Sequence, residues 1–289
     1  MLLSAQWRGG STFAEGLIFT TSDEARSLFL LDEPAITAYA LARPHGDVFP
    51  DVLRPQVAAF NAEALSCHFH HYNQSKLHSW QADRAELSGL SALSFTSFAA
   101  LRRACLRRDR HSRALKTIRM IGSLPSFMAH PLVRSTWCRV MLLVRHPLAI
   151  IRSRRKIIGP STLARADLDP AYVCRLMLQD VRAVIDMTTV AASEQAESHG
   201  RRHSSQLLRY SDLVRNPHRA AREVHSHLQL HTNSTALDAF ISKHMGGAED
   251  GQTTYSLDRA RRECASTTRM DSVHSCASLL ILTHPLYDC

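Results

Sequence analysis

Two short segments combine positive charge, hydroxyl groups and tight turns in a way that suits phosphate binding. The first is Arg8-Gly9-Gly10-Ser11-Thr12, which lies between an apolar opening and a helix-like run. Glycines let the backbone approach a phosphate, and the amides and dipole of a helix start favour an anion. Ser11 and Thr12 add hydroxyl donors, and Arg8 adds charge-assisted hydrogen bonds. The segment is not a Walker A loop, and a Gly-Gly turn is also typical of plain connections.

The second segment, residues 145–153 (RHPLAIIRS), follows the most apolar run of the chain, Cys138–Val144. A continuous apolar run is typical of a buried parallel strand, and Pro147 suits the first position of a helix. Arg145 is therefore expected at the carboxyl end of a strand, with Ser153 about two turns into the next helix. Ligands of open α/β sheets bind at such strand ends, so the two segments predict a clamp for a ligand with two phosphate groups. On spacing alone, a solvent-exposed arginine that ends a strand is the simpler interpretation of Arg145.

Strands and helices must alternate to position these segments. The opening Met1–Trp7 and four other short runs predict strands: residues 27–31, 114–120, 138–144 and 206–210. Helices are expected after the Gly turn and from Pro147, Asp169-Pro170 and Asn216-Pro217. The alternation predicts an α/β fold with a central, mostly parallel sheet covered by helices, within one domain spanning 1–289.

Two regions have weaker patterns. Residues 35–113 are polar and helix-like, with a loop predicted at 43–55 because it holds three prolines and Gly46. Residues 246–289 form a poorly defined tail, polar over 246–275.

Composition narrows the class of protein. The chain has 289 residues, 45% of them hydrophobic, and a net charge of +9, which favours anionic partners. It has no apolar run of 18 residues, no signal-peptide pattern and no internal repeat. Membrane-spanning, repeat and low-complexity classes are therefore excluded for this sequence.

Seven cysteines leave two interpretations open. They lie at Cys67, Cys105, Cys138, Cys174, Cys264, Cys276 and Cys289, with no CxxC pair. An oxidising compartment would allow one to three disulfides with one thiol left over. Alternatively, most are small buried apolar residues.

Five segments in order resemble the Golgi carbohydrate sulfotransferases, the 6-O-sulfotransferases of N-acetylglucosamine, galactose and N-acetylgalactosamine. RGGSTF and RHPLAIIRS resemble the family's 5′-phosphosulfate motif, roughly R-[ST]-G-S-[ST]-F, and its 3′-phosphate motif, roughly R-D-P-R-A-x-x-x-S. The other three are LFLLDEP (28–34), ALKTIRM (114–120) and LLRYSDLVRNPHRAAREVHSHLQL (207–230). Cys67-His68-Phe69, Cys105 and Cys276 also resemble segments of this family. The resemblance covers most of residues 1–230.

The sequence departs from the family pattern at several points. His146 stands where the family has Asp, and Ser211 where it has Glu. No tryptophan occurs in residues 260–275, and the phosphate loop begins at residue 8, without the membrane anchor and stem of family members. An inactive relative that only binds the nucleotide therefore stays open as an alternative.

The resemblance implies an enzyme with a P-loop-like three-layer sandwich that uses 3′-phosphoadenylyl sulfate (PAPS) and no metal. Arg8 and the backbone amides of Gly9, Gly10, Ser11, Thr12 and Phe13 would hold the 5′-phosphosulfate, with Arg8 also stabilising charge on the leaving phosphate. Arg145 and Ser153 would bind the 3′-phosphate. Glu33 would be the base that activates a sugar hydroxyl, most simply a 6-hydroxyl.

The implied partner is a glycan acceptor, acidic glycans included, bound by an insertion at 35–113, and the implied compartment is the Golgi lumen. A nucleic-acid partner is not expected. Membrane association is expected only if an N-terminal anchor is missing from this chain. Lys116 and Arg119 are expected to face the sulfate or the acceptor. The arginine-rich run 102–113 is usual for a solvated helix face, but also suits an acidic glycan.

Other interpretations compete with these roles. His45, His68, His70 and His71 are alternatives to Glu33 as the base, and the spacing around Cys67 is poor for a metal site. A different P-loop enzyme, such as a small-molecule kinase, would need the Walker lysine that the chain lacks. A basic nucleic-acid-binding protein fits the charge, but no binding motif supports it.

Overall fold

The fold is built on a parallel sheet. The computed structural model describes residues 1–5, 9–26, 28–32, 53–69, 97–107, 112–118, 120–136, 138–157, 169–194 and 203–245. Five strands of these residues form one sheet in the order β2-β3-β1-β4-β5, and every neighbouring pair is parallel. Their bounds are β1 Leu2–Ala5, β2 Leu28–Asp32, β3 Ser112–Thr117, β4 Cys138–Val144 and β5 His203–Arg209. The expected α/β fold with a central parallel sheet is confirmed.

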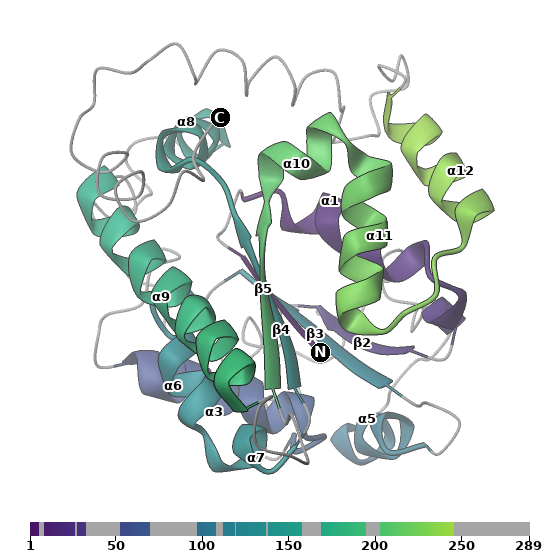
Figure 1. Ribbon diagram of the computed structural model, residues 1–289. Coiled ribbons are helices and arrows are strands. Elements are labelled where there is room, and N and C mark those ends of the chain that lie inside the picture. Colours follow the sequence, from purple (N-terminus) through teal and green to yellow (C-terminus); the bar gives the residue numbers. More distant parts are fainter. Residues whose placement is uncertain are drawn as a thin grey trace.

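Side chains alternate between the two faces of the sheet, as strand geometry requires. Phe29 and Leu31 of β2 face one core, whereas Leu28 and Leu30 face the other. Helices cover both faces (Figure 1).

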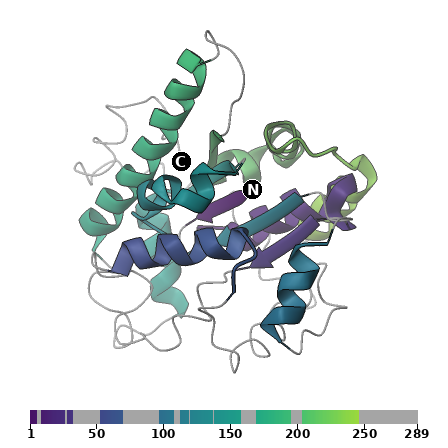
Figure 2. The ribbon, with the colours of Figure 1, turned by 90° about the horizontal axis from the view of Figure 1, so that it is seen from below.

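The first face is covered by α3, α5, α6, α7, α8 and α9. Their bounds are Arg54–Leu65, Phe98–Cys105, Leu124–Ala129, Pro131–Arg134, Pro147–Ile157 and Pro170–Glu194. Each contributes buried apolar side chains to a core with Leu2, Leu115 and Leu142 of the sheet. Figure 2 shows α3 lying across this side of the sheet, with α5 beyond its end.

The second face is covered by α1, η1, α10, α11 and α12. Their bounds are Ser11–Glu15, Gly16–Thr20, Tyr210–Arg215, Pro217–Leu228 and Ser234–Met245, and η2 (Asp23–Arg26) follows η1. η1 is a π-helix that continues α1 without a break. Phe13 and Ile18 of this segment pack with Leu3, Met141 and Leu208 of the sheet.

The strand predictions agree best where the apolar run is continuous. β4 has the predicted bounds, while β3 ends at Thr117, three residues before the predicted end, because Ile118 bends and the chain turns at Gly122. β5 begins three residues earlier than predicted and ends at Arg209, since its polar first half pairs with β4 although it lacks an apolar pattern.

The region of residues 35–113 contains helices, as expected, in the parts that the structure describes. The predicted loop at 43–55 is wrong at its end, because Arg54 and Pro55 already belong to α3, where proline suits the first turn. Residues 43–52 and the tail 246–289 lie outside the described residues.

α3 is fastened to α9 at its first residue. The Arg54 guanidinium donates hydrogen bonds to the Tyr172 hydroxyl (3.1 Å) and to the Gln179 amide oxygen (3.3 Å). Next to Gln179, the buried Asp180 carboxylate accepts hydrogen bonds from the Gly122 and Leu124 amides (2.8 and 3.0 Å). Burial raises the pKa of Asp180 to about 7, although these two amides and the charge of Arg54 oppose the shift.

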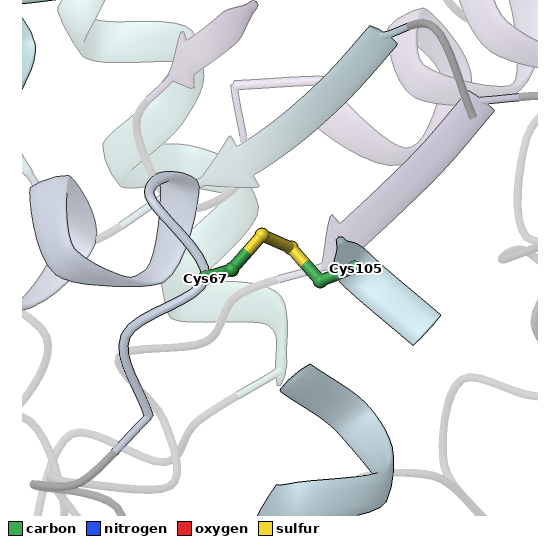
Figure 3. Close-up of a disulfide and its surroundings, with 2 residues drawn as sticks. All are labelled: Cys67 and Cys105. Carbon is green, nitrogen blue, oxygen red and sulfur yellow. A yellow bond between two sulfur atoms is a disulfide. The ribbon is translucent and has the colours of Figure 1, made fainter. Parts of the chain in front are cut away.

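The cysteines divide between the two predicted roles. Cys67 and Cys105 form a disulfide that joins the end of α3 to the end of α5 (Figure 3). Cys174 is also disulfide-bonded, whereas Cys138 is a buried free thiol on β4. Burial raises the pKa of the Cys138 thiol, as expected for an inert core cysteine.

None of the helices among the described residues combines the length and apolar character needed to cross a membrane.

Candidate functional site

The Gly-Gly turn lies directly between β1 and α1. Gly10 has a φ of 90°, a left-handed conformation that favours glycine, and is the residue before the first helical turn. Its carbonyl accepts a hydrogen bond from the Ala14 amide (3.1 Å). The amides of the first helical turn have no acceptor within the helix, so they can serve an anion.

Gly10 is needed for a second reason, which is close packing against Tyr210. A Cβ atom at Gly10 would lie 2.2 Å from Cε2 and 2.4 Å from Cδ2 of the Tyr210 ring, far inside contact distance. Tyr210 is buried and is the first residue of α10, immediately after β5. The end of β5 therefore closes against the glycine turn that follows β1.

Tyr210 also contacts the second predicted segment. The guanidinium carbon of Arg145 lies 4.5 Å from the centroid of the Tyr210 ring, a cation–π geometry. Arg145 is half-buried and follows β4 directly. One aromatic ring thus touches both segments that the sequence assigned to phosphate binding. Gly10, Arg145 and Tyr210 are called the junction below.

The sheet topology places the junction at the strand ends where α/β proteins commonly bind ligands. β1 and β4 are hydrogen-bonded neighbours, but their following helices lie on opposite faces. Phe13 and Ala14 of α1 join one core, and Ile150 of α8 joins the other. Loops that diverge in this way mark the position, at the carboxyl ends of the strands, where α/β proteins bind ligands.

His146 begins α8 as a neutral cap. Its Nδ1 accepts a hydrogen bond from the Leu148 amide (3.3 Å). Burial, with a contribution from the charge of Arg152, lowers the pKa of His146 and favours the neutral imidazole. The imidazole performs the helix-capping task to which aspartate is also suited, so the departure from the family pattern leaves the start of α8 intact.

Positively charged side chains follow along α8, beyond its first turn. It contains Arg152, Arg154, Arg155 and Lys156 and no acidic residue. The Arg154 side chain is almost fully buried, and Ser153 is half-buried about 9 Å along the helix from Pro147. The assignment of Ser153 to a phosphate remains a prediction.

A buried ion pair joins α1 to β3. Lys116 Nζ of β3 is 3.7 Å from Glu15 Oε2 of α1, and both side chains are almost completely buried. Lys116 is paired in register with Leu3 of β1. The ion pair with Glu15 accounts for the buried position of Lys116 and ties α1 to the sheet. The expectation that Lys116 faces the sulfate or the acceptor stays a prediction.

The structure brings together only part of the predicted site. Gly9 and Gly10 form the turn, Ser11 and Thr12 begin α1, and Arg145 joins this segment through Tyr210. The Phe13 ring packs on Phe240 and His244 of α12 (centroids 5.6 and 5.7 Å apart), and the assignment of its amide to a phosphate stays a prediction. Arg8, Glu33, His45, His70, His71 and Arg119 lie outside the described residues.

Tyr210 was missed as a site residue because tyrosine in a short apolar strand resembles a core residue. Its position just after a strand on the carboxyl edge is the one signal that could have indicated a role. Ser211, where the family has Glu, is buried in the first turn of α10.

Metal ligation finds no support within the described ranges. No group of three His, Cys, Asp or Glu side chains there is arranged around a common point. The sulfur of Cys67 is in a disulfide and so is not a thiolate ligand.

No model of a known protein family matches the chain, and no curated protein matches it either.

Proposed function

We propose that this protein is a sulfotransferase that transfers a sulfuryl group from PAPS to a sugar hydroxyl, most simply a 6-hydroxyl, of a glycan. The observation that supports it is the junction, where Tyr210 touches both Gly10 and Arg145. These belong to the two segments whose residue types suit a 5′-phosphosulfate and a 3′-phosphate. In this proposal the sheet and its glycine turn form a P-loop-like three-layer sandwich.

The residues present fit a ligand of this kind. The first-turn amides of α1 suit an oxyanion. Arg145 supplies a planar guanidinium, which pairs well with phosphate oxygens.

The donor supplies the sulfuryl group. The protein positions the donor and the acceptor and stabilises the charge that develops during transfer. Arg8 and the amides of Gly9 to Phe13 hold the 5′-phosphosulfate and stabilise charge that builds on its phosphate. Arg145 and Ser153 fix the 3′-phosphate. Glu33, which follows β2, takes the proton from the acceptor hydroxyl, because a neutral sugar hydroxyl is a weak nucleophile.

The proposed compartment is the Golgi lumen. The disulfide between Cys67 and Cys105 supports an oxidising environment.

Binding of adenosine 3′,5′-bisphosphate tests the donor site directly. A ligand that binds only the folded state at 100 times its dissociation constant adds about 2.7 kcal/mol of stability, enough to raise the thermal midpoint by several degrees. Arg145→Ala should weaken binding by roughly 10–100-fold, the range for a charged hydrogen bond. Arg155→Ala is the matched control, because Arg155 is exposed on α8. We expect it to change affinity less than about twofold.

Transfer from labelled PAPS to a panel of glycans tests the activity. Glu33→Gln should abolish transfer while bisphosphate binding persists, since the base does not hold the donor. A folded protein that retains ATP–Mg²⁺ but not the bisphosphate would instead support a kinase. Bisphosphate binding without transfer to any glycan would indicate an inactive relative.

A further inference from the structure

A cavity lies between the end of α3 and α5. It has a volume of about 480 Å³, and its described lining consists of His68, Phe69, Phe98, Ala99 and Arg102. Pockets of roughly 300–1,000 Å³ hold small ligands or single sugar residues. None of these residues belongs to the segments assigned to the donor. The cavity is called the α3–α5 pocket below.

A covalent bond joins the two walls of the pocket. Cys67 immediately precedes His68 and Phe69 on one wall, and Cys105 lies three residues after Arg102 on the other. Figure 3 shows the disulfide connecting the end of α3 to the end of α5. Separation of the walls is therefore restricted, and the pocket is preorganised for a ligand.

Local structure fixes the lining residues on each wall. Cys67 has a φ of 62°, and the His68 amide donates to the Glu63 carbonyl (2.8 Å), so the chain turns sharply as α3 ends. On α5, the Ser97 hydroxyl accepts a hydrogen bond from the Ala100 amide (3.2 Å) and caps the helix. Phe98 and Arg102 are four residues apart and so share one face of α5.

The lining of the pocket changes from apolar side chains on the inside to a cationic side chain at the rim. Phe69 is buried in the core, Phe98 and His68 are half-buried, and Arg102 is exposed at the rim. α5 contains no acidic residue, and Arg103 and Arg107 add exposed positive charge beside it. Aromatic rings suit the apolar face of a sugar ring, and a guanidinium at the rim suits a carboxylate or sulfate.

We propose that the α3–α5 pocket binds an acidic sugar residue of the glycan acceptor. A neutral sugar would use the rings and leave the charge of Arg102 without a counterpart, whereas an anionic sugar uses both. The acceptor role rests on the proposed function, but binding of an acidic sugar by these residues does not.

Calorimetric titration of the full chain tests the proposal at physiological salt. The probes are a tetrasaccharide of alternating glucuronate and N-acetylglucosamine, a sulfated tetrasaccharide of the same length, and a neutral N-acetylglucosamine tetramer. We expect at least one acidic probe to bind roughly tenfold or more tightly than the neutral one. The preferred acidic probe distinguishes a carboxylate from a sulfate as the recognised group.

Arg102→Ala and Arg103→Ala form a matched pair, because both arginines are exposed neighbours on α5 and only Arg102 lines the pocket. Arg102→Ala should weaken acidic-probe binding about tenfold or more, and Arg103→Ala less than about twofold. Phe98→Leu, which keeps an apolar side chain, should weaken it several-fold. Both arginine variants should bind adenosine 3′,5′-bisphosphate like the unmodified protein.

Three results would overturn the proposal: equal losses in the two arginine variants, equal binding of the neutral tetramer, or no saccharide binding by a protein that still binds the bisphosphate. The last would leave the proposed function standing. Saccharide binding that depends on Arg102, in a protein that does not bind the bisphosphate, would support the pocket and remove the sulfotransferase proposal.

Discussion

The junction and the α3–α5 pocket are held together by different means. At the junction, the ends of β1, β4 and β5 meet through packing, with the Tyr210 ring against Gly10 and beneath Arg145. At the pocket, a disulfide joins two helix ends through cysteines that are 38 residues apart in the sequence.

The difference follows from what each region packs upon. The junction grows out of a parallel sheet whose hydrogen bonds already align the strand ends, so a turn and one ring suffice. The pocket lies where helix ends meet at the margin of the core, with exposed residues at its rim. There, a disulfide holds the two helix ends together, as the hydrogen bonds of the sheet hold the strand ends at the junction.

The largest expected effect concerns the buried ion pair between Lys116 and Glu15. Lys116→Met leaves Glu15 buried without this cation, and Glu15→Met does the converse, so each should cost about 3–5 kcal/mol of unfolding free energy. The double variant should recover most of the loss, because two well-packed apolar groups replace the pair. Urea denaturation measures all three. Additive losses in the double variant would show that the pair itself contributes little.

Removing the disulfide should affect the α3–α5 pocket and leave the junction unchanged. Loss of a crosslink spanning 38 residues costs about 4 kcal/mol in the chain-entropy account, so Cys67→Ser with Cys105→Ser should lower the stability by that order. Measured where the variant is still folded, bisphosphate affinity should stay within about twofold, while acidic-saccharide affinity falls. Equal loss of both affinities would show that the regions are coupled.

A smaller effect is expected at the Tyr210 ring. Tyr210→Leu removes the cation–π contact with Arg145, an interaction of roughly 0.5–2 kcal/mol, and should weaken bisphosphate binding about threefold to thirtyfold. Tyr210→Phe retains the ring and is the matched control. Saccharide affinity should be unchanged in both. If Phe and Leu are equally harmful, the hydroxyl rather than the ring is what matters.

The smallest effect is expected at the cap of α8. His146→Ala should cost about 1 kcal/mol, and His146→Asp should restore most of it, since aspartate also accepts from the helix amides. The lowered pKa of His146 means that the unfolded chain takes up the proton first. Stability from this group is therefore present above the unfolded pKa of about 6.5 and is lost as the pH falls below it. Denaturation of the unmodified protein and His146→Asp at two pH values measures this; a step of the same size in both would assign it to another group.

Particular elements show what could be predicted. β4 is continuous and apolar, and its bounds were predicted correctly, whereas the polar half of β5 is a strand only because β4 pairs with it. The motif of Phe13 predicts a role for its backbone amide and does not indicate where its ring packs. The packing of α12 decides that its ring lies in the core.

The sequence by itself determined the alternation of strands and helices, the glycine turn after the first strand and the arginine after β4, because these depend on local periodicity and backbone conformation. Only the tertiary structure decided that β1 and β4 are neighbours, that Tyr210 contacts both loops, and that Cys67 pairs with Cys105. Those contacts join residues far apart in the chain. Their selection depends on strand order and side-chain packing, which no local pattern encodes.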